Sequence, residues 1–147
     1  MKFILDKLSR LNIGWNERVL TEVDFNRLCR RFRIRVEEMP LRPGGFYYRV
    51  LGRDYIAIDS RLTGVRKLAV EFHELAHYLF HTPESGASAN FHGLGRTRKE
   101  READAFALCA IMPLALIKTR TPAELIDDGF PADLVTERMA IYDRYAI

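Results

Sequence analysis

The chain has 147 residues, of which 48% are hydrophobic and 29% are charged. This composition is typical of a soluble globular domain and excludes a disordered chain. The net charge of +3 arises from 23 basic and 20 acidic side chains, a surplus too small to indicate nucleic-acid binding by itself.

Local patterns argue against further classes of protein. No apolar stretch approaches the roughly 20 residues of a membrane helix. An acidic residue interrupts the apolar start of the chain too early for a secretory signal. Cys29 and Cys109 lie far apart and form no Cys-x-x-Cys pair, so neither a disulfide framework nor a cysteine-rich zinc site is expected. We therefore expect a cytoplasmic protein with reduced thiols.

The first part of the chain is predicted to form one helix and three strands. Thr21 is a suitable cap for a helix whose apolar stripe runs to Phe32. Residues 33–38 alternate apolar and charged side chains before Met39 and Pro40, which indicates a short half-buried strand. Residues 46–50 and 55–59 are two aromatic or β-branched runs around a short polar segment, and they predict a β-hairpin.

The second part of the chain is predicted to be mainly helical. Residues 61–80 carry apolar side chains on one broad helical face, and residues 82–97 form the longest predicted loop. A helix then begins at Thr97 and stops at Met112, and two more helices cover residues 121–129 and 131–145. The prediction is one α+β domain over residues 1–147, with a helical core, a small antiparallel sheet and a C-terminal helical segment at residues 121–147.

The strongest functional signal is a His-Glu-x-x-His motif formed by His73, Glu74 and His77. The spacing of four residues brings both imidazoles to one side of the predicted helix, where they can bind one Zn²⁺ at about 2.0–2.1 Å. Glu74 is rotated about 100° from His73, so its carboxylate can take a proton from a water molecule at the metal. The alternative is a helix with buried or solvated histidines and no metal, in which each buried imidazole needs a hydrogen-bond partner.

A catalytic zinc ion usually has three protein ligands, so a third is needed. Glu100 is the preferred candidate, and Asp104 shares its helix face and can orient a ligand histidine. Glu102 points roughly 200° away from Glu100 and is either the alternative ligand or a solvated charge. The alternative role of Glu100 is purely structural, because it also fits a capping box with Thr97.

Two further histidines have open roles. His81 continues the four-residue spacing but drifts by about 40° per step, so we expect a helix-end or surface role rather than metal contact. His92 lies in the predicted loop and either faces the substrate or is an exposed side chain. The developing negative charge on a substrate carbonyl also needs a hydrogen-bond donor, for which the candidates are Tyr47, Tyr48, His92 and Arg96.

These motifs resemble the ImmA/IrrE family of metallopeptidases, which is related to the gluzincins. The resemblance covers about residues 20–120 and rests on the hairpin, on the HELAH core at residues 73–77, on residues 100–107 and on the following Met-Pro pair. It implies that His73, His77 and Glu100 bind zinc and that Glu74 is the catalytic base. The chain departs from the family pattern at residue 76, where alanine replaces a common glycine, and at Asp104, where asparagine is frequent.

The resemblance also implies a zinc-dependent endopeptidase that cleaves a helix-turn-helix transcriptional repressor in gene regulation or a stress response. We expect such a protein partner, no membrane and no direct contact with nucleic acid. A basic cluster either receives an acidic partner or a DNA-bound repressor or is a solvated face; it comprises Arg27, Arg30, Arg31, Arg33 and Arg35. The alternatives are a non-catalytic regulatory or partner-binding module that retains the fold, and a hydrolase of another substrate such as a small amide.

Overall fold

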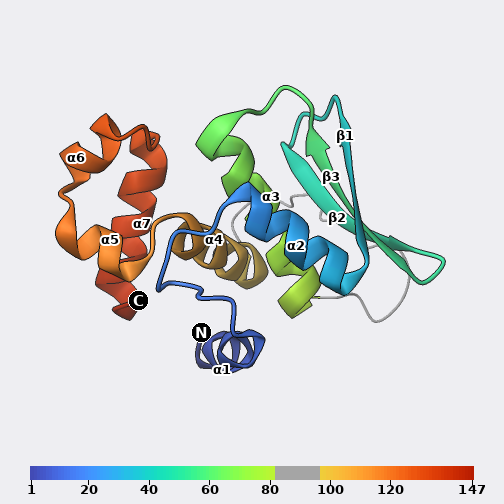
Figure 1. Ribbon diagram of the computed structural model, residues 1–147, viewed down its shortest axis with the longest axis horizontal. Helices are drawn as coiled ribbons and strands as arrows, with labels where there is room; N and C mark the ends of the chain where they lie inside the picture. Colours follow the sequence, from blue (N-terminus) through green and yellow to red (C-terminus); the bar gives the residue numbers. More distant parts are fainter. Residues whose placement is uncertain (82–96) are drawn as a thin grey trace.

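The computed structural model of the protein describes residues 1–81 and 97–147. Most of the predicted loop, with His92 and Arg96, lies outside the described residues. The fold is α+β, as predicted (Figure 1). In chain order the elements are α1 (Lys2–Leu11), α2 (Glu22–Phe32), β1 (Ile34–Met39), β2 (Gly45–Val50), β3 (Arg53–Asp59), α3 (Gly64–His81), α4 (Arg98–Ile111), α5 (Leu114–Thr119), α6 (Pro122–Asp127) and α7 (Ala132–Tyr145).

In the part of the chain that the structure describes, the sheet has three strands in the order β1-β3-β2. The predicted hairpin is confirmed, because β2 runs antiparallel to β3 with Tyr47 opposite Ile56. The pairing of β1 with β3 is parallel, with Val36 opposite Ile56, so the sheet is mixed rather than purely antiparallel. The hairpin places β2 on one side of β3, which leaves the other side of β3 to β1. Alternation of side chains identifies a strand but carries no information about its direction.

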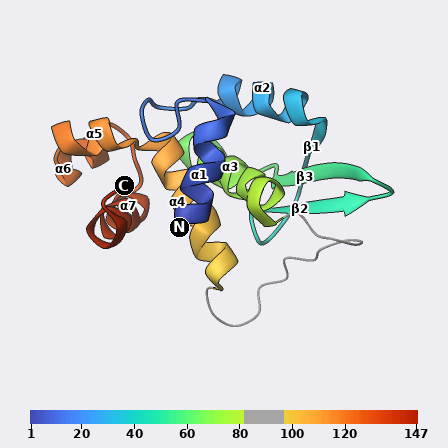
Figure 2. The same cartoon turned by 90° about the horizontal axis from the view of Figure 1, so that it is seen from below.

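The core forms where α3 lies between the sheet and α4, with α2 alongside (Figures 1 and 2). Phe72 on α3 is fully buried, and its ring meets the ring of Phe25 from α2 at 5.8 Å and that of Phe106 from α4 at 6.2 Å. Both contacts are edge-to-face, the arrangement that aromatic rings prefer. The predicted apolar faces of these three helices therefore meet in one cluster. In the described part of the chain, no helix has both the length and the apolar character that crossing a membrane requires.

Helices α1 and α5 are absent from the sequence-based prediction. Ile4 and Leu8 of α1 are buried, and their spacing of four residues is the signal that identifies this helix. The Lys7 ammonium of α1 donates a hydrogen bond to the Leu79 carbonyl at the end of α3. Helix α5 has only six residues, too few for a periodic pattern to stand out from its surroundings.

Arg138 of α7 has a fully buried side chain, whose hydrogen bonds hold this helix against the rest of the fold. Its guanidinium donates to the Met112 carbonyl at 2.7 Å, to the Ile147 carbonyl at 2.8 Å and to the Asn16 side-chain oxygen at 3.2 Å. Three oxygen acceptors therefore satisfy this buried cation. The C-terminal helix is held in a fixed position beside α4, where it forms one wall of the cleft described below.

Glu71 is a buried acid on α3 that lies near Glu22 of α2 and Glu38 of β1. The residue is 2% exposed, and its Oε1 atom has no hydrogen-bond partner among the described residues. Lys67 pairs instead with Glu38 at 2.7 Å and with Glu22 at 3.2 Å. Burial, with a smaller contribution from the negative charge of Glu22, raises the pKa of Glu71 to about 7.

We expect the free energy of unfolding of the metal-free protein to decrease between about pH 5 and about pH 8, and the Glu71→Gln variant to lack this component. The unfolded carboxyl ionises near pH 4.5, whereas the folded one keeps its proton up to about pH 7. Unfolding therefore releases a proton in this interval, so a rising pH destabilises the folded state by at most about 3 kcal/mol. Urea unfolding of both proteins at the two pH values measures the difference, and an identical pH dependence would contradict the prediction.

Candidate metal centre

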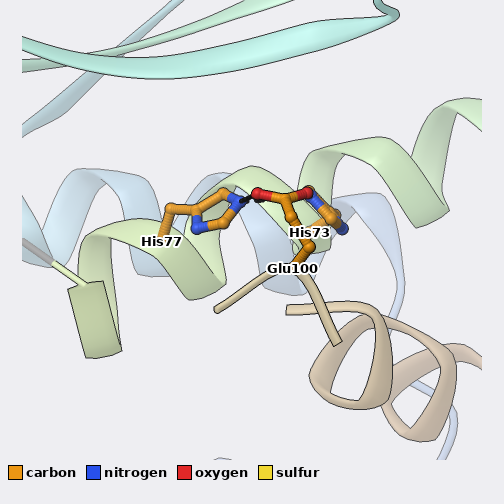
Figure 3. Close-up of side chains that lie close together, drawn as sticks. All are labelled: His73, His77 and Glu100. Carbon is orange, nitrogen blue, oxygen red and sulfur yellow. Dashed lines mark hydrogen bonds and ion pairs between the residues drawn. The ribbon is translucent and has the colours of Figure 1, made fainter. Parts of the chain in front are cut away.

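Helices α3 and α4 bring together two imidazoles and one carboxylate (Figure 3). The Nε2 atoms of His73 and His77 are 3.2 Å apart, one helical turn along the same side of α3. The Glu100 carboxylate reaches across from the first turn of α4, with Oε2 at 3.1 Å from His73 Nε2 and Oε1 at 3.1 Å from His77 Nε2. The structure thus brings together the three residues that the sequence suggests as metal ligands.

The donor set fits a divalent metal ion. In tetrahedral sites, nitrogen and carboxylate ligands bind at about 2.0–2.1 Å, which places the ligand atoms about 3.4 Å from one another. The separations of 3.1 and 3.2 Å in this cluster are close to that value. Among the described residues, His73, His77 and Glu100 are the group of potential ligands whose donor atoms lie within 4.8 Å of one another.

A second carboxylate holds the first of these histidines in place. His73 Nδ1 lies 2.9 Å from Asp104 Oδ1, one turn beyond Glu100 on α4. Burial lowers the pKa of His73, but hydrogen bonds to Asp104 and Glu100 outweigh this effect and raise the pKa to about 10. Hydrogen bonds with His73 and His77 hold the pKa of Glu100 well below its ordinary range. Without a metal, the Glu100 carboxylate is therefore the counter-charge of a protonated His73.

Glu100 also lies at the beginning of α4, where the sequence suggests a capping box. The Thr97 hydroxyl accepts a hydrogen bond from the Glu100 backbone N–H at 3.2 Å, which is the first half of that motif. The Glu100 side chain supplies no second half, because its carboxylate contacts the two imidazoles instead. The cap and the contact with the histidines therefore involve different groups of the same residue.

Glu74 points from α3 toward the first residues of β2. The residue is 5% exposed; the backbone N–H of Tyr47 donates to its carboxylate, and its Oε2 atom has no hydrogen-bond partner among the described residues. Burial raises the pKa of Glu74. A Cβ atom at Gly45 would lie 3.2 Å from Glu74 Cγ and 2.9 Å from the Ala57 carbonyl oxygen, so glycine is what allows β2 to lie directly beside this acid.

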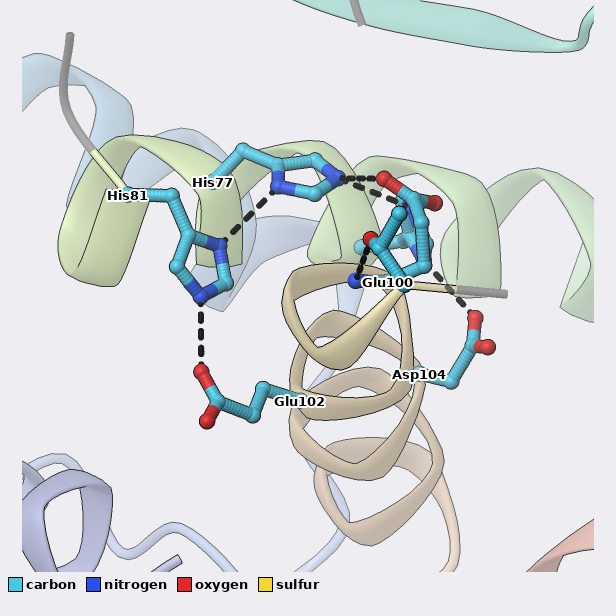
Figure 4. A network of polar contacts seen from close by, with 7 residues as sticks. His77, His81, Glu100, Glu102 and Asp104 are labelled. Carbon is cyan, nitrogen blue, oxygen red and sulfur yellow. Dashed lines mark hydrogen bonds and ion pairs between the residues drawn. The ribbon is translucent and has the colours of Figure 1, made fainter. Parts of the chain in front are cut away.

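His81 and Glu102 form a pair on the other side of the cluster (Figure 4). His81 is the last residue of α3, as predicted, but its side chain is only 7% exposed, so the expected surface role is wrong. His81 Nε2 lies 2.8 Å from Glu102 Oε2, and His81 Nδ1 lies 3.1 Å from His77 Nδ1. Glu102 is 12% exposed and also accepts from Arg98 at 2.8 Å, so it is not a freely solvated charge.

The tyrosines suggested as donors to a substrate carbonyl are engaged elsewhere. The Tyr47 hydroxyl donates to Asp54 at 2.5 Å, near the far end of the hairpin. Tyr48 is the next residue along β2 and therefore points to the opposite face of the sheet, where its ring stacks on Tyr55 at 4.9 Å. The five arginines of the predicted basic cluster are all exposed, along α2 and β1.

A cleft of about 560 Å³ opens beside the histidines and extends toward α7. At one end it is lined by His73, Glu74 and Glu100. Leu134 and Glu137 of α7 line the other end. Two of the candidate ligands, His73 and Glu100, and the buried acid Glu74 therefore face a space that can receive a substrate segment.

Residues 29–130 match the family model described as the IrrE N-terminal-like domain, a peptidase family, and this span contains the histidines, both α4 glutamates and the hairpin. Neither a search of curated proteins nor a search of solved structures gave a significant match. The chain therefore belongs to the IrrE N-terminal-like family of metallopeptidases.

Proposed function

We propose that this protein is a zinc-dependent endopeptidase that cleaves a helix-turn-helix transcriptional repressor. The observation that carries the proposal is the convergence of His73, His77 and Glu100 beside Glu74, whose buried Oε2 atom has no partner among the described residues. A buried carboxylate oxygen without a hydrogen bond is costly, and a water molecule beside the metal ion would satisfy it. A metal site beside a buried carboxylate base can support peptide hydrolysis.

Zinc is the ion that this ligand set favours, and when bound it supplies a Lewis acid that polarises the substrate carbonyl and acidifies water. His73, His77 and Glu100 hold the ion, and Asp104 orients His73. Glu74 accepts the proton of the attacking water at its carboxylate and then delivers it to the amine that leaves. Burial raises the pKa of Glu74, which favours a carboxyl group that holds the proton before it passes to the leaving amine.

The substrate peptide is proposed to bind in an extended conformation along β2. Among the described residues, β2 is paired on one side only in the order β1-β3-β2, and its first residues lie against Glu74. An extended chain can add to such an edge through backbone hydrogen bonds, with its scissile bond close to the acid. The cleft between α3, α4 and α7 then receives the adjoining substrate side chains.

A repressor as substrate is supported by the resemblance to the ImmA/IrrE family, and the role that we propose is in gene regulation or a stress response in the cytoplasm. The test is incubation of the zinc-loaded protein with a candidate helix-turn-helix repressor, followed by mass spectrometry of the products. We expect cleavage at one bond, about one zinc ion per chain, and no cleavage after chelation. Binding of a repressor that remains intact would favour a non-catalytic regulatory module, and cleavage of short amides alone would favour a different hydrolase.

A further inference from the structure

We propose that Glu102 and His81 are positioning residues, which fix the tautomer of His77 so that its Nε2 atom presents an electron pair to the metal. The inference rests on the proposed metal site and adds to it a hydrogen-bond chain that runs from Glu102 through His81 to His77 (Figure 4). Neither Glu102 nor His81 belongs to the cluster of three ligand residues.

The first step in the chain is set by the Glu102 carboxylate. Its oxygens only accept hydrogen bonds when ionised, so the nitrogen that faces Oε2 at 2.8 Å must carry a hydrogen atom. That nitrogen is His81 Nε2. A neutral imidazole has one N–H group, so the other nitrogen, His81 Nδ1, is left with an electron pair.

The second step follows from the contact between the two histidines. His77 Nδ1 lies 3.1 Å from His81 Nδ1, a separation at which two electron pairs would repel and one N–H group forms a hydrogen bond. The hydrogen atom must therefore lie on His77 Nδ1. The electron pair of His77 is then on Nε2, which lies 3.1 Å from Glu100 Oε1 and 3.2 Å from His73 Nε2, separations that would suit atoms bound to one metal ion between them.

Burial makes this chain effective, because water competes poorly for its hydrogen bonds. The exposed fractions of the side chains are 2% for His77, 7% for His81 and 12% for Glu102. The second oxygen of Glu102 accepts from Arg98, whose side chain is 77% exposed, so this outer ion pair lies in water rather than in the buried chain. Asp104 of α4 thus contacts His73 directly, whereas Glu102 of the same helix acts on His77 through the imidazole of His81.

The test measures zinc affinity by competition with a chromophoric chelator, which requires no turnover. We expect Glu102→Ala and His81→Ala each to weaken zinc binding by about 10-fold, the lower end of the effect of partners behind a ligand. The double variant should bind no more weakly than His81→Ala alone, because both residues act through one contact. Glu102→Gln keeps an oxygen acceptor and should restore most of the affinity, whereas Arg98→Ala removes an exposed ion pair and should have little effect.

A second measurement uses the unaltered protein and therefore does not depend on the folding of a variant. Nitrogen-15 NMR of the zinc-loaded protein should show His81 with its hydrogen on Nε2 and His77 with its hydrogen on Nδ1. A hydrogen on His81 Nδ1, or an unchanged zinc affinity in a folded Glu102→Ala variant, would overturn the proposal. Its failure is distinguishable from failure of the proposed function, because a protein that binds zinc with these tautomers but cleaves no peptide would disprove only the latter.

Discussion

The Glu74→Gln variant is expected to cleave its protein substrate about 10²–10⁴-fold more slowly than the unaltered protein. Glutamine has nearly the shape of glutamate and keeps an oxygen to accept the Tyr47 backbone N–H. It cannot accept the proton of the attacking water, so the step that Glu74 is proposed to perform is lost. The measurement is the rate of appearance of the repressor fragments at saturating zinc.

The matched control for this variant is Glu71→Gln, which makes the same change in a buried acid one turn earlier on α3. We expect this control to retain cleavage, because Glu71 lies near α2 and β1 rather than near the three candidate metal ligands. Both variants should contain as much zinc as the unaltered protein. A Glu74→Gln variant with undiminished cleavage would show that another group is the base, whereas one without zinc would indicate that Glu74 supports the metal site itself.

Loss of a metal ligand is expected to have the second large effect. His77→Ala and Glu100→Gln each remove one of three donors, and we expect a loss of zinc affinity well beyond the roughly 10–100-fold of an outer partner. Elemental analysis after dialysis should then find about one zinc ion in the unaltered protein and almost none in these two variants. Glu102→Gln, two residues from Glu100 on the same helix, is the matched control and should retain the metal. A loss of zinc in the control but not in Glu100→Gln would make Glu102 the third ligand.

The apparent affinity for zinc should decrease as the pH falls. Without a metal, the pKa of His73 is about 10, so near neutral pH its Nε2 atom carries a hydrogen that the metal must displace. Binding therefore releases a proton from His73, and this residue alone weakens the apparent affinity about 10-fold for each unit that the pH falls. Calorimetry in two buffers with different ionisation enthalpies counts the released protons, and a count of zero near neutral pH would contradict this account.

The sequence by itself identifies the parts of the site that depend on local geometry. His73 and His77 share a helix face because a helix makes one turn in 3.6 residues, and Glu100 and Asp104 share a face for the same reason. The hairpin, the central helix and the caps at Thr21 and Thr121 are likewise recognisable, because their signals lie within a few residues of one another. The α+β class and the family follow from these local signals.

Only the tertiary structure decides which residues from different elements meet. The contact between His81 and Glu102 cannot be recognised in the sequence, because it forms only when α3 packs against α4 and brings together residues 21 positions apart. The choice between Glu100 and Glu102 as the residue beside the two imidazoles depends on the same packing, because both lie near the beginning of α4. The parallel direction of β1 is also set by long-range pairing. Contacts of this kind depend on how buried surfaces fit together, and a local pattern records only which surfaces are available.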